Sequence, residues 1–315
     1  MAQQVVVGLD AGGTSTRCAA VSPEGGLLGY GRAPGANNLS GGDPAAALAQ
    51  ALRGALSGIP GAEVSHAVFG LAGAATAGRE RSAEVAQEAW DGLGLPGAPR
   101  VTDDIAVAFA AGSAADVGAV LIAGTGAVAA RVRSGAVVRR SDGNGWLLGD
   151  EGSAVWLALA GLRAALAALD GRGGPTSLCE RLAARLKVPA HDPGALVRAA
   201  HARAPAELGG LAPEVGAAAA AGDPAAVRVV ADAARHLLAS LAAVEPDVGG
   251  EPVVLAGGVL EEGPVADAVR DGLRERGCAE PLRAADGALG AGRLALRDRG
   301  SPPQAHAALL RHAVR

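Results

Sequence analysis

The 315-residue chain has little of what nucleic-acid surfaces and metal clusters require. Aromatic residues make up 2% of it, and its formal net charge is -4 at pH 7. An extended nucleic-acid surface needs a basic footprint and stacking rings. The three cysteines, Cys18, Cys179 and Cys278, stand far apart without a C-x-x-C pair. The sequence therefore predicts no nucleic-acid partner and no zinc site, and its cysteines favour a reducing, cytoplasmic compartment.

Long hydrophobic runs are also missing. The apolar stretch 117–130 is too short and too rich in glycine to span a bilayer. A strand pattern begins by Val5, without a charged leader or a cleavage site before it. These features predict a chain that is neither anchored in a membrane nor exported. Half of its residues are hydrophobic, and its length predicts two domains with sizeable cores.

Strands and helices alternate along the first part of the chain. The run VVVGLD predicts a buried strand, and the segment 16–33 continues it as an antiparallel meander, so the sheet should be mixed. Asp43 followed by Pro44 predicts a helix start. A strand at 66–73, a helix around 78–92, a strand at 100–104 and a helix at 105–111 follow. This alternation is typical of the α/β class.

The opening pattern recurs in the second half, where strands around a glycine turn occupy 117–132 and 136–143. Helical spacing then dominates, with VVLAGGV at 253–259 as one strand between helices. We therefore expect an α/β domain at 1–112 and a larger one at 113–315. Small residues at helical spacing from about residue 287 predict a last helix packed closely against a sheet, and we expect it to return to the first domain.

Three glycine turns follow apolar strands, at 10–14, 123–126 and 256–259. Glycine lets backbone amides converge on a phosphate, and neighbouring threonine hydroxyls add donors. A Walker loop is excluded because the single lysine, Lys187, precedes Val188 and not Ser or Thr. A dinucleotide fold would need a helix after Gly124, whereas the valine-rich stretch there predicts a hairpin. The three turns favour a nucleotide site of another kind.

Five segments, taken together, resemble one family. LDAGGTSTR, RVTDD, LIAGTGAVAARV, GNGWLLGDEGSAVWLA and VVLAGGV occur in the order found in N-acetylglucosamine kinases. These kinases belong to the BadF/BadG-type ATPase branch of the actin/hexokinase-like superfamily. The resemblance runs from about Val5 to Ala295, and GDEGSA is its most diagnostic segment. It implies two ribonuclease H-like domains, each a mixed sheet flanked by helices, with ATP and a sugar in the cleft between them.

The resemblance also implies roles for individual residues. Asp10 matches a carboxylate that holds Mg²⁺, usually through water. Asp103 matches the catalytic base that takes the proton of the sugar 6-hydroxyl, although the adjacent Asp104 remains a competing candidate and Asp103 could also be a helix cap. The expected phosphate and adenosine contacts are Gly12, Gly13, Thr14, Thr125, Gly126, Gly257 and Gly258.

The expected sugar contacts lie in two loops. Asn37, or Asn38 beside it, matches a sugar-hydroxyl contact, because an amide supplies both donor and acceptor. Gly143, Asn144, Gly145 and Asp150 match the substrate loop, with Asp150 at a sugar-binding position. Relatives usually carry tryptophan where this chain has Asn144, and here Trp146 lies two positions later. Glu151 beside them is interpreted as an ion-pair or capping residue.

The sequence thus predicts an ATP- and Mg²⁺-dependent kinase acting on the 6-hydroxyl of N-acetylglucosamine. A homodimer is expected from the resemblance. Glucosamine, N-acetylmannosamine and muramic derivatives stay open as acceptors. An activator-type ATPase is disfavoured because no cysteine is flanked by ligand loops for an iron-sulfur cluster. A sugar sensor without turnover is the remaining alternative, which the acidic residues Asp10 and Asp103 disfavour.

Overall fold

The computed structural model describes residues 3–13, 15–36, 43–72, 78–244 and 250–312. The chain divides into two compact units. Unit 1 comprises Met1–Gly118, Val132–Val138 and Leu282–Arg315, and unit 2 comprises Ala119–Arg131 and Arg139–Pro281. Each unit is therefore discontinuous in sequence. The division passes through the strands that follow residue 117, so these strands contribute residues to both units.

The sheet of unit 1 has the strand order β3-β2-β1-β4-β5. Its pairs β1/β2 and β2/β3 are antiparallel, whereas β1/β4 and β4/β5 are parallel, which confirms the predicted mixed sheet. The elements of this part are β1 (Gln3–Ala11), β2 (Ser15–Val21), β3 (Leu27–Pro34), α1 (Pro44–Leu56), β4 (Ala62–Leu71), α2 (Arg79–Asp91), β5 (Arg100–Asp103) and α3 (Asp104–Gly112). The predicted elements of this half are confirmed.

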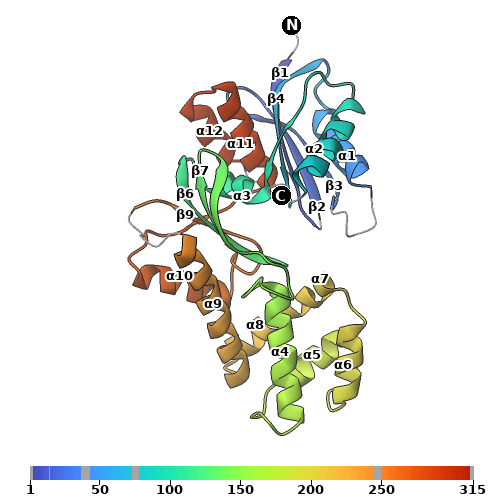
Figure 1. Cartoon of the computed structure of the whole chain (residues 1–315), viewed down its shortest axis with the longest axis vertical. Helices are drawn as coiled ribbons and strands as arrows, with labels where there is room; N and C mark the ends of the chain where they lie inside the picture. The colour runs from blue at the N-terminus through green and yellow to red at the C-terminus, as the bar shows by residue number, and fades with distance from the viewer. Residues whose placement is uncertain (1–2, 14, 37–42, 73–77, 245–249, 313–315) are drawn as a thin grey trace. The chain divides into compact units, whose positions relative to one another are not determined.

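Both faces of this sheet are covered, because alternate residues of β1 enter different cores. Val5, Val7 and Leu9 pack with residues of α1 and α2. Val6 packs on the other face with α3, α11 (Gly287–Arg299) and α12 (Pro303–Leu310). Figure 1 shows the strands of unit 1 between these two helical layers.

Helix α11 approaches the sheet so closely that side chains are excluded at the contact. A Cβ at Gly8 would overlap the backbone of Gly292 and Ala288. The prediction that the helix starting near 287 packs closely on a sheet is confirmed, and a further helix, α12, follows it. This contact brings the C-terminal segment into unit 1 beside the first strand.

The second sheet repeats the strand order of the first, as β10-β9-β6-β7-β8. Strands β6 and β9 are parallel, as β1 and β4 are. The elements of this part are β6 (Val117–Ala123), β7 (Ala127–Arg133), β8 (Ala136–Asp142), α4 (Ala154–Leu169), α5 (Leu178–Leu186), α6 (Pro193–His201), α7 (Pro205–Leu208), α8 (Ala212–Ala220), α9 (Pro224–Val244), β9 (Val253–Ala256), α10 (Pro264–Glu275) and β10 (Leu282–Arg283).

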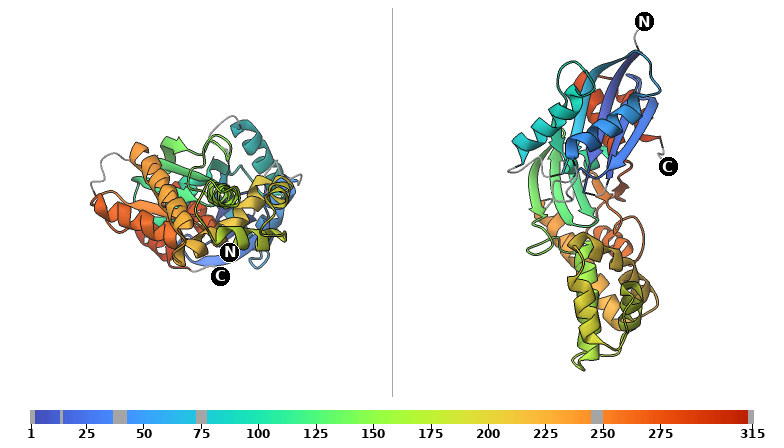
Figure 2. Two further views of the ribbon diagram at one scale, coloured as in Figure 1. Left: turned by 90° about the horizontal axis from the view of Figure 1, so that it is seen from below. Right: turned by 90° about the vertical axis from the view of Figure 1, so that its right-hand side faces the viewer.

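The core of unit 2 lies between its sheet and its helices. Leu121 and Leu255 of the strands pack with Leu157, Leu182 and Leu237 of the helices. Helix α4 contacts α5, α8 and α9, as the views in Figures 1 and 2 show. Within the described residues, no helix combines the length and the apolar character that crossing a membrane requires.

Candidate functional site

Asp10 lies at the carboxyl end of β1, where the first glycine turn begins. Its Cα lies opposite Arg17 on β2 and Gly70 on β4. The turn is closed by a hydrogen bond of 3.0 Å from the Gly12 N–H to the Ser15 carbonyl. Gly13 is exposed next to it, while Thr14, a predicted phosphate contact, lies outside the described residues.

The pKa of Asp10 is raised to about 6. Burial is the largest cause, the Asp286 charge acts in the same direction, and the Arg17 guanidinium opposes both. The carboxylate lies against Gly287, the first residue of α11, where a Cβ would overlap it. A carboxylate beside a helix N-terminus interacts favourably with the helix dipole. Asp10 therefore presents a negative charge whose burial is only partly compensated.

Asp286 joins three elements near Asp10. Its Oδ2 accepts a hydrogen bond of 2.8 Å from the Tyr30 hydroxyl and forms a 3.3 Å ion pair with Arg17. Its Oδ1 caps α11 by accepting from the Ala288 N–H at 2.9 Å. Neither Asp286 nor Arg17 was among the residues predicted from the sequence. The signal for Asp286 was available, since an aspartate directly before GALG is a helix-capping pattern.

Asp103 is the last residue of β5, and Asp104 is the first residue of α3. Asp103 is buried, and its Oδ1 accepts a 2.8 Å hydrogen bond from the Ile105 N–H, so it is the N-cap of α3. The capping role weighed from the sequence is thus present. Burial raises the pKa of Asp104, as do the hydrogen bond and the charge of Asp103 and the more distant charge of Asp10. Three carboxyl groups therefore influence one another at this edge of the sheet.

The chemistry of these donors fits Mg²⁺. Oxygen ligands are what this ion prefers, and it is usually bound through one or two carboxylates together with water and phosphate. Within the described ranges, no group of three or more His, Cys, Asp or Glu side chains is arranged to hold a metal. Asp10 could accordingly serve as a single protein carboxylate for an ion whose other ligands come from elsewhere. The predicted sugar contacts Asn37 and Asn38 lie outside the described residues.

The second glycine turn, Gly124–Gly126, joins β6 to β7 and contacts the first residue of helix α4. It is closed by a 2.9 Å hydrogen bond from the Gly124 N–H to the Gly126 carbonyl. The Gly124 carbonyl accepts from the Ala154 N–H at 2.8 Å, so the turn lies at the start of α4. Thr125 is exposed at its tip. This arrangement presents a hydroxyl beside a helix N-terminus, which suits a phosphate.

The predicted substrate loop is held by Asp142, which the sequence analysis did not single out. Its Oδ1 and Oδ2 accept hydrogen bonds of 2.8 Å from the N–H groups of Asp150 and Glu151, respectively. Asp142 itself has φ of 63° and directly precedes Gly143. An Asp-Gly pair is typical of a turn. The Asp142 carboxylate, at the start of the loop, therefore closes it by binding two backbone N–H groups at its end.

Asp150 lies beside the second glycine turn. Burial raises its pKa and the Asp142 charge adds to this effect, while backbone hydrogen bonds from Ala127 and Gly145 lower it. A Cβ at Gly126 would contact the Asp150 carboxylate. The structure thus brings the predicted sugar contact Asp150 next to the predicted phosphate contact Gly126.

The tip of the substrate loop is apolar and exposed. Trp146, Leu147 and Leu148 have exposed fractions of 47%, 74% and 81%. The Gly145 carbonyl accepts hydrogen bonds from the N–H groups of Leu148 and Gly149, so the tip is an ordered turn. Glu151 beside it is half exposed, and its Oε2 lies 2.8 Å from the His236 Nδ1.

The third glycine turn, Gly257–Gly258, follows β9 and lies against the second. Gly257 has φ of 89°, and a Cβ there would overlap the Ala123 carbonyl. The Val259 N–H donates to that same carbonyl at 3.0 Å. Only glycine combines this backbone conformation with this close approach.

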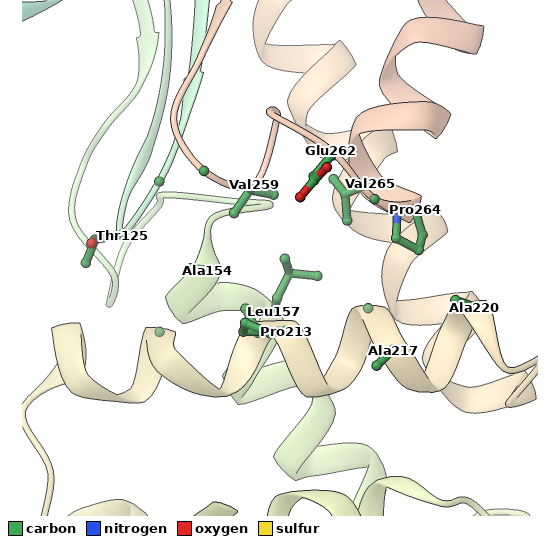
Figure 3. A pocket seen from close by; sticks show the side chains of 16 residues that line it. Thr125, Ala154, Leu157, Pro213, Ala217, Ala220, Val259, Glu262, Pro264 and Val265 are labelled. Atoms are coloured by element: carbon green, nitrogen blue, oxygen red, sulfur yellow. The ribbon is translucent and has the colours of Figure 1, made fainter. Parts of the chain in front are cut away.

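A cavity of about 690 Å³ opens between these two turns and the helices of unit 2. Thr125 and Gly258 line one part of it, and residues of α4, α8 and the start of α10 line other parts (Figure 3). The volume is within the range of small-molecule sites. The lining residues are mostly small or apolar: Gly124, Thr125, Ala154, Leu157, Gly209, Ala212, Pro213, Gly216, Ala217, Ala220, Gly258, Val259, Glu262, Gly263, Pro264 and Val265.

Comparisons with known proteins relate the chain to an ATPase family and to proteins named N-acetylglucosamine kinases. The model of the BadF/BadG/BcrA/BcrD ATPase family matches residues 7–295. A Clostridium acetobutylicum protein named N-acetylmuramic acid/N-acetylglucosamine kinase is 30% identical over 194 residues. That match covers 60% of this chain and 63% of the relative, which is less than two thirds of the relative's length.

Two solved structures match over nearly their whole length. A candidate N-acetylglucosamine kinase from Chromobacterium violaceum is 26% identical, with a TM-score of 0.75 and coverage of 93% of this chain and 99% of the other. A candidate N-acetylglucosamine kinase from Porphyromonas gingivalis is 21% identical, with a TM-score of 0.72 and the same coverages. The predicted fold class, two mixed sheets flanked by helices as in actin/hexokinase-like ATPases, is confirmed.

Proposed function

The chain belongs to the BadF/BadG/BcrA/BcrD ATPase family, and from this premise we propose that it is an ATP-dependent amino-sugar kinase. The acceptor we propose is the 6-hydroxyl of N-acetylglucosamine. The names of the Clostridium acetobutylicum relative and of the Chromobacterium violaceum structure support this class of reaction. The proposal extends to Mg²⁺ dependence, a cytoplasmic location and a homodimer, which are expected from the resemblance.

The observation that carries the proposal is the acidic edge of unit 1. Asp10 lies near the carboxyl end of β1 and Asp103 at that of β5, with β4 between these two strands of one sheet, and the charges of both act on Asp104. Phosphoryl transfer to an alcohol needs an acceptor for the hydroxyl proton and a site for the ion that accompanies ATP. In the proposal Asp103 is the proton acceptor and Asp10 holds Mg²⁺, which neutralises phosphate charge when bound.

The environment of the two adjacent aspartates supports Asp103 over Asp104 as the base. The Ile105 N–H fixes the orientation of the Asp103 side chain. Burial and the neighbouring charges raise the pKa of Asp104, so Asp104 retains its proton to higher pH. In the reaction the sugar O6 forms a bond to the γ-phosphorus, the bond from that phosphorus to ADP breaks, and the O6 proton passes to the Asp103 carboxylate.

Unit 2 supplies the proposed nucleotide site. Thr125 and the amides of the second glycine turn would contact phosphate, and the cavity beside Gly258 would take the adenosine. Asp150, held by Asp142, would accept hydrogen bonds from sugar hydroxyls. Transfer requires that the sugar O6 whose proton passes to Asp103 reaches the γ-phosphorus of the bound nucleotide.

The test is ADP formation by the purified chain with MgATP and a panel of sugars. The panel includes N-acetylglucosamine, glucosamine, N-acetylmannosamine, N-acetylmuramic acid and glucose, with a reaction lacking sugar as control. We expect ADP only with amino sugars, fastest with N-acetylglucosamine, and a product whose phosphorus couples to the protons on carbon 6 in NMR. ADP release at the same rate without sugar would instead support an ATPase.

A further inference from the structure

Glu262 is the one ionisable side chain among the described residues that line the cavity of unit 2. It follows the third glycine turn and directly precedes Gly263, the N-cap residue of α10. In the described part of the chain, no hydrogen bond or ion pair engages its carboxylate. A carboxylate without a protein partner in an otherwise apolar cavity is available to a ligand that donates hydrogen bonds.

The backbone that carries Glu262 is fixed at several points. The Val259 N–H donates to the Ala123 carbonyl at 3.0 Å, and the Leu260 N–H to the Gly257 carbonyl at 2.9 Å. The Arg270 guanidinium donates to the carbonyls of Leu260 and Glu261, at 3.1 and 3.0 Å. Glu262 is therefore held at a defined position on the cavity wall.

That position lies between two chemically different parts of the cavity. The Thr125 side, with its hydroxyl and glycine amides, suits phosphate. On the other side Pro264 faces α8, where its Cδ lies 3.8 Å from a Cβ placed at Gly216. Figure 3 shows Glu262 between Thr125 and Pro264, next to Val259 and Val265, with Ala217 across the cavity. A nucleotide with its phosphates near Thr125 and its base near Pro264 has its ribose in between.

We propose that the Glu262 carboxylate accepts hydrogen bonds from the ribose 2′- and 3′-hydroxyls of the bound nucleotide and makes the site selective for ribonucleotides. The two vicinal hydroxyls match the two oxygens of a carboxylate. The exocyclic amine of adenine is the competing donor, but it belongs to the base and lies farther from the phosphates than the ribose does. This inference rests on the proposed nucleotide site and specifies which residue makes that site prefer ribonucleotides.

The test measures binding and needs no sugar. The dissociation constants of ADP, 2′-deoxyADP and IDP are measured by calorimetry, in the presence of Mg²⁺, for the wild type, Glu262→Ala and Glu261→Ala. Glu261 is the matched control, because it is exposed on the same loop and does not line the cavity. Ratios of constants are compared, since removing a negative charge changes the affinity for every nucleotide.

We expect the wild type and Glu261→Ala to bind ADP about tenfold more tightly than 2′-deoxyADP, the effect of about one hydrogen bond to a charged group. In Glu262→Ala this ratio falls to about one, while the ADP-to-IDP ratio is unchanged. If Glu262→Ala still binds ADP about tenfold more tightly than 2′-deoxyADP, the inference is overturned. If only the ratio of the ADP and IDP constants changes, the carboxylate contacts the base and the inference is also overturned. If the wild type binds no ADP, the proposed nucleotide site itself fails.

Discussion

The two sheets have the same strand order, but the glycine turns of unit 1 and of unit 2 carry different chemistry. In unit 1 the turn at the end of β1 begins with Asp10, and two further carboxyl groups lie at the end of β5 and at the start of α3. In unit 2 the corresponding turn after β6 carries Thr125 and lies beside an apolar cavity. The same backbone scaffold thus presents carboxylates in one unit, and amides, a hydroxyl and an apolar surface in the other. The scaffold alone does not determine what each copy contributes.

This difference has an energetic side. The Asp10 carboxylate is buried with incomplete compensation, and such a group lowers the stability of the folded state once it is ionised. The glycine turns of unit 2 contain no carboxylate of their own, and they are closed by backbone hydrogen bonds from the Gly124 N–H to the Gly126 carbonyl and from the Val259 N–H to the Ala123 carbonyl. Unit 1 therefore holds charges that a purely structural sheet edge would not need, as expected of a functional site.

The largest expected effect follows from removing the charge of Asp10. Asp10→Asn should reduce ADP formation by roughly 10²- to 10³-fold, because a metal site at phosphate is worth several kcal/mol in the transition state. The same change should stabilise unit 1. The native pKa of about 6 lies above the unfolded value of 3.8, so the wild type loses stability as pH rises from about 4 to 6.

Between pH 4 and pH 6 the free energy of unfolding of the wild type should fall by about 3 kcal/mol, and that of Asp10→Asn should not fall. Denaturant unfolding at pH 4, 5, 6 and 7.5 without Mg²⁺ measures the difference. Above pH 6 the variant should be the more stable protein. A variant that is less stable than the wild type at pH 7.5 would show that Asp10 is a structural residue.

The next effect concerns the close contact between the glycine turns of unit 2. Gly257→Ala adds a Cβ at φ of 89° against the Ala123 carbonyl, which should destabilise unit 2 by about 3 kcal/mol and weaken ADP binding at least tenfold. Gly277→Ala is the matched control, since Gly277 has φ of 73° with no atom within 4 Å of the added Cβ. Equal losses of ADP affinity in both variants would show that the close approach of Gly257 to the Ala123 carbonyl is not needed for ADP binding.

A smaller and more selective effect is expected at the substrate loop. Asp142→Asn keeps the left-handed backbone that Asn tolerates, but weakens the charge-assisted bonds to the N–H groups of Asp150 and Glu151. The KM for the sugar should rise about tenfold, with the Kd for ADP unchanged. Asp271→Asn, at an exposed ion pair with Arg274, is the control. A parallel loss of ADP affinity would show that the Asp142 hydrogen bonds stabilise the whole of unit 2 and not the substrate loop alone.

Local signals predicted much of the fold. The apolar run at Val5 and the capping pair Asp43-Pro44 identified a strand and a helix because these signals depend on neighbouring residues. The same holds for Asp103 after its strand. The pairing of Asp286 with Arg17 could not be predicted, because the two residues are 269 positions apart in sequence and only the packing of α11 on β1 and β2 brings them together. Asp142 was missed because its task is to bind backbone N–H groups, which no residue pattern displays.

The central claim is that unit 1 supplies the proton acceptor while unit 2 holds the nucleotide. Its most direct test is Asp103→Asn, in which ADP binding and sugar-dependent ADP formation are measured on the same preparation. Asn is also a good N-cap, so α3 should remain intact. The account predicts an unchanged Kd for ADP and a turnover reduced by roughly 10²- to 10⁴-fold. Near-normal turnover with amino sugars would contradict the account and direct attention to Asp104.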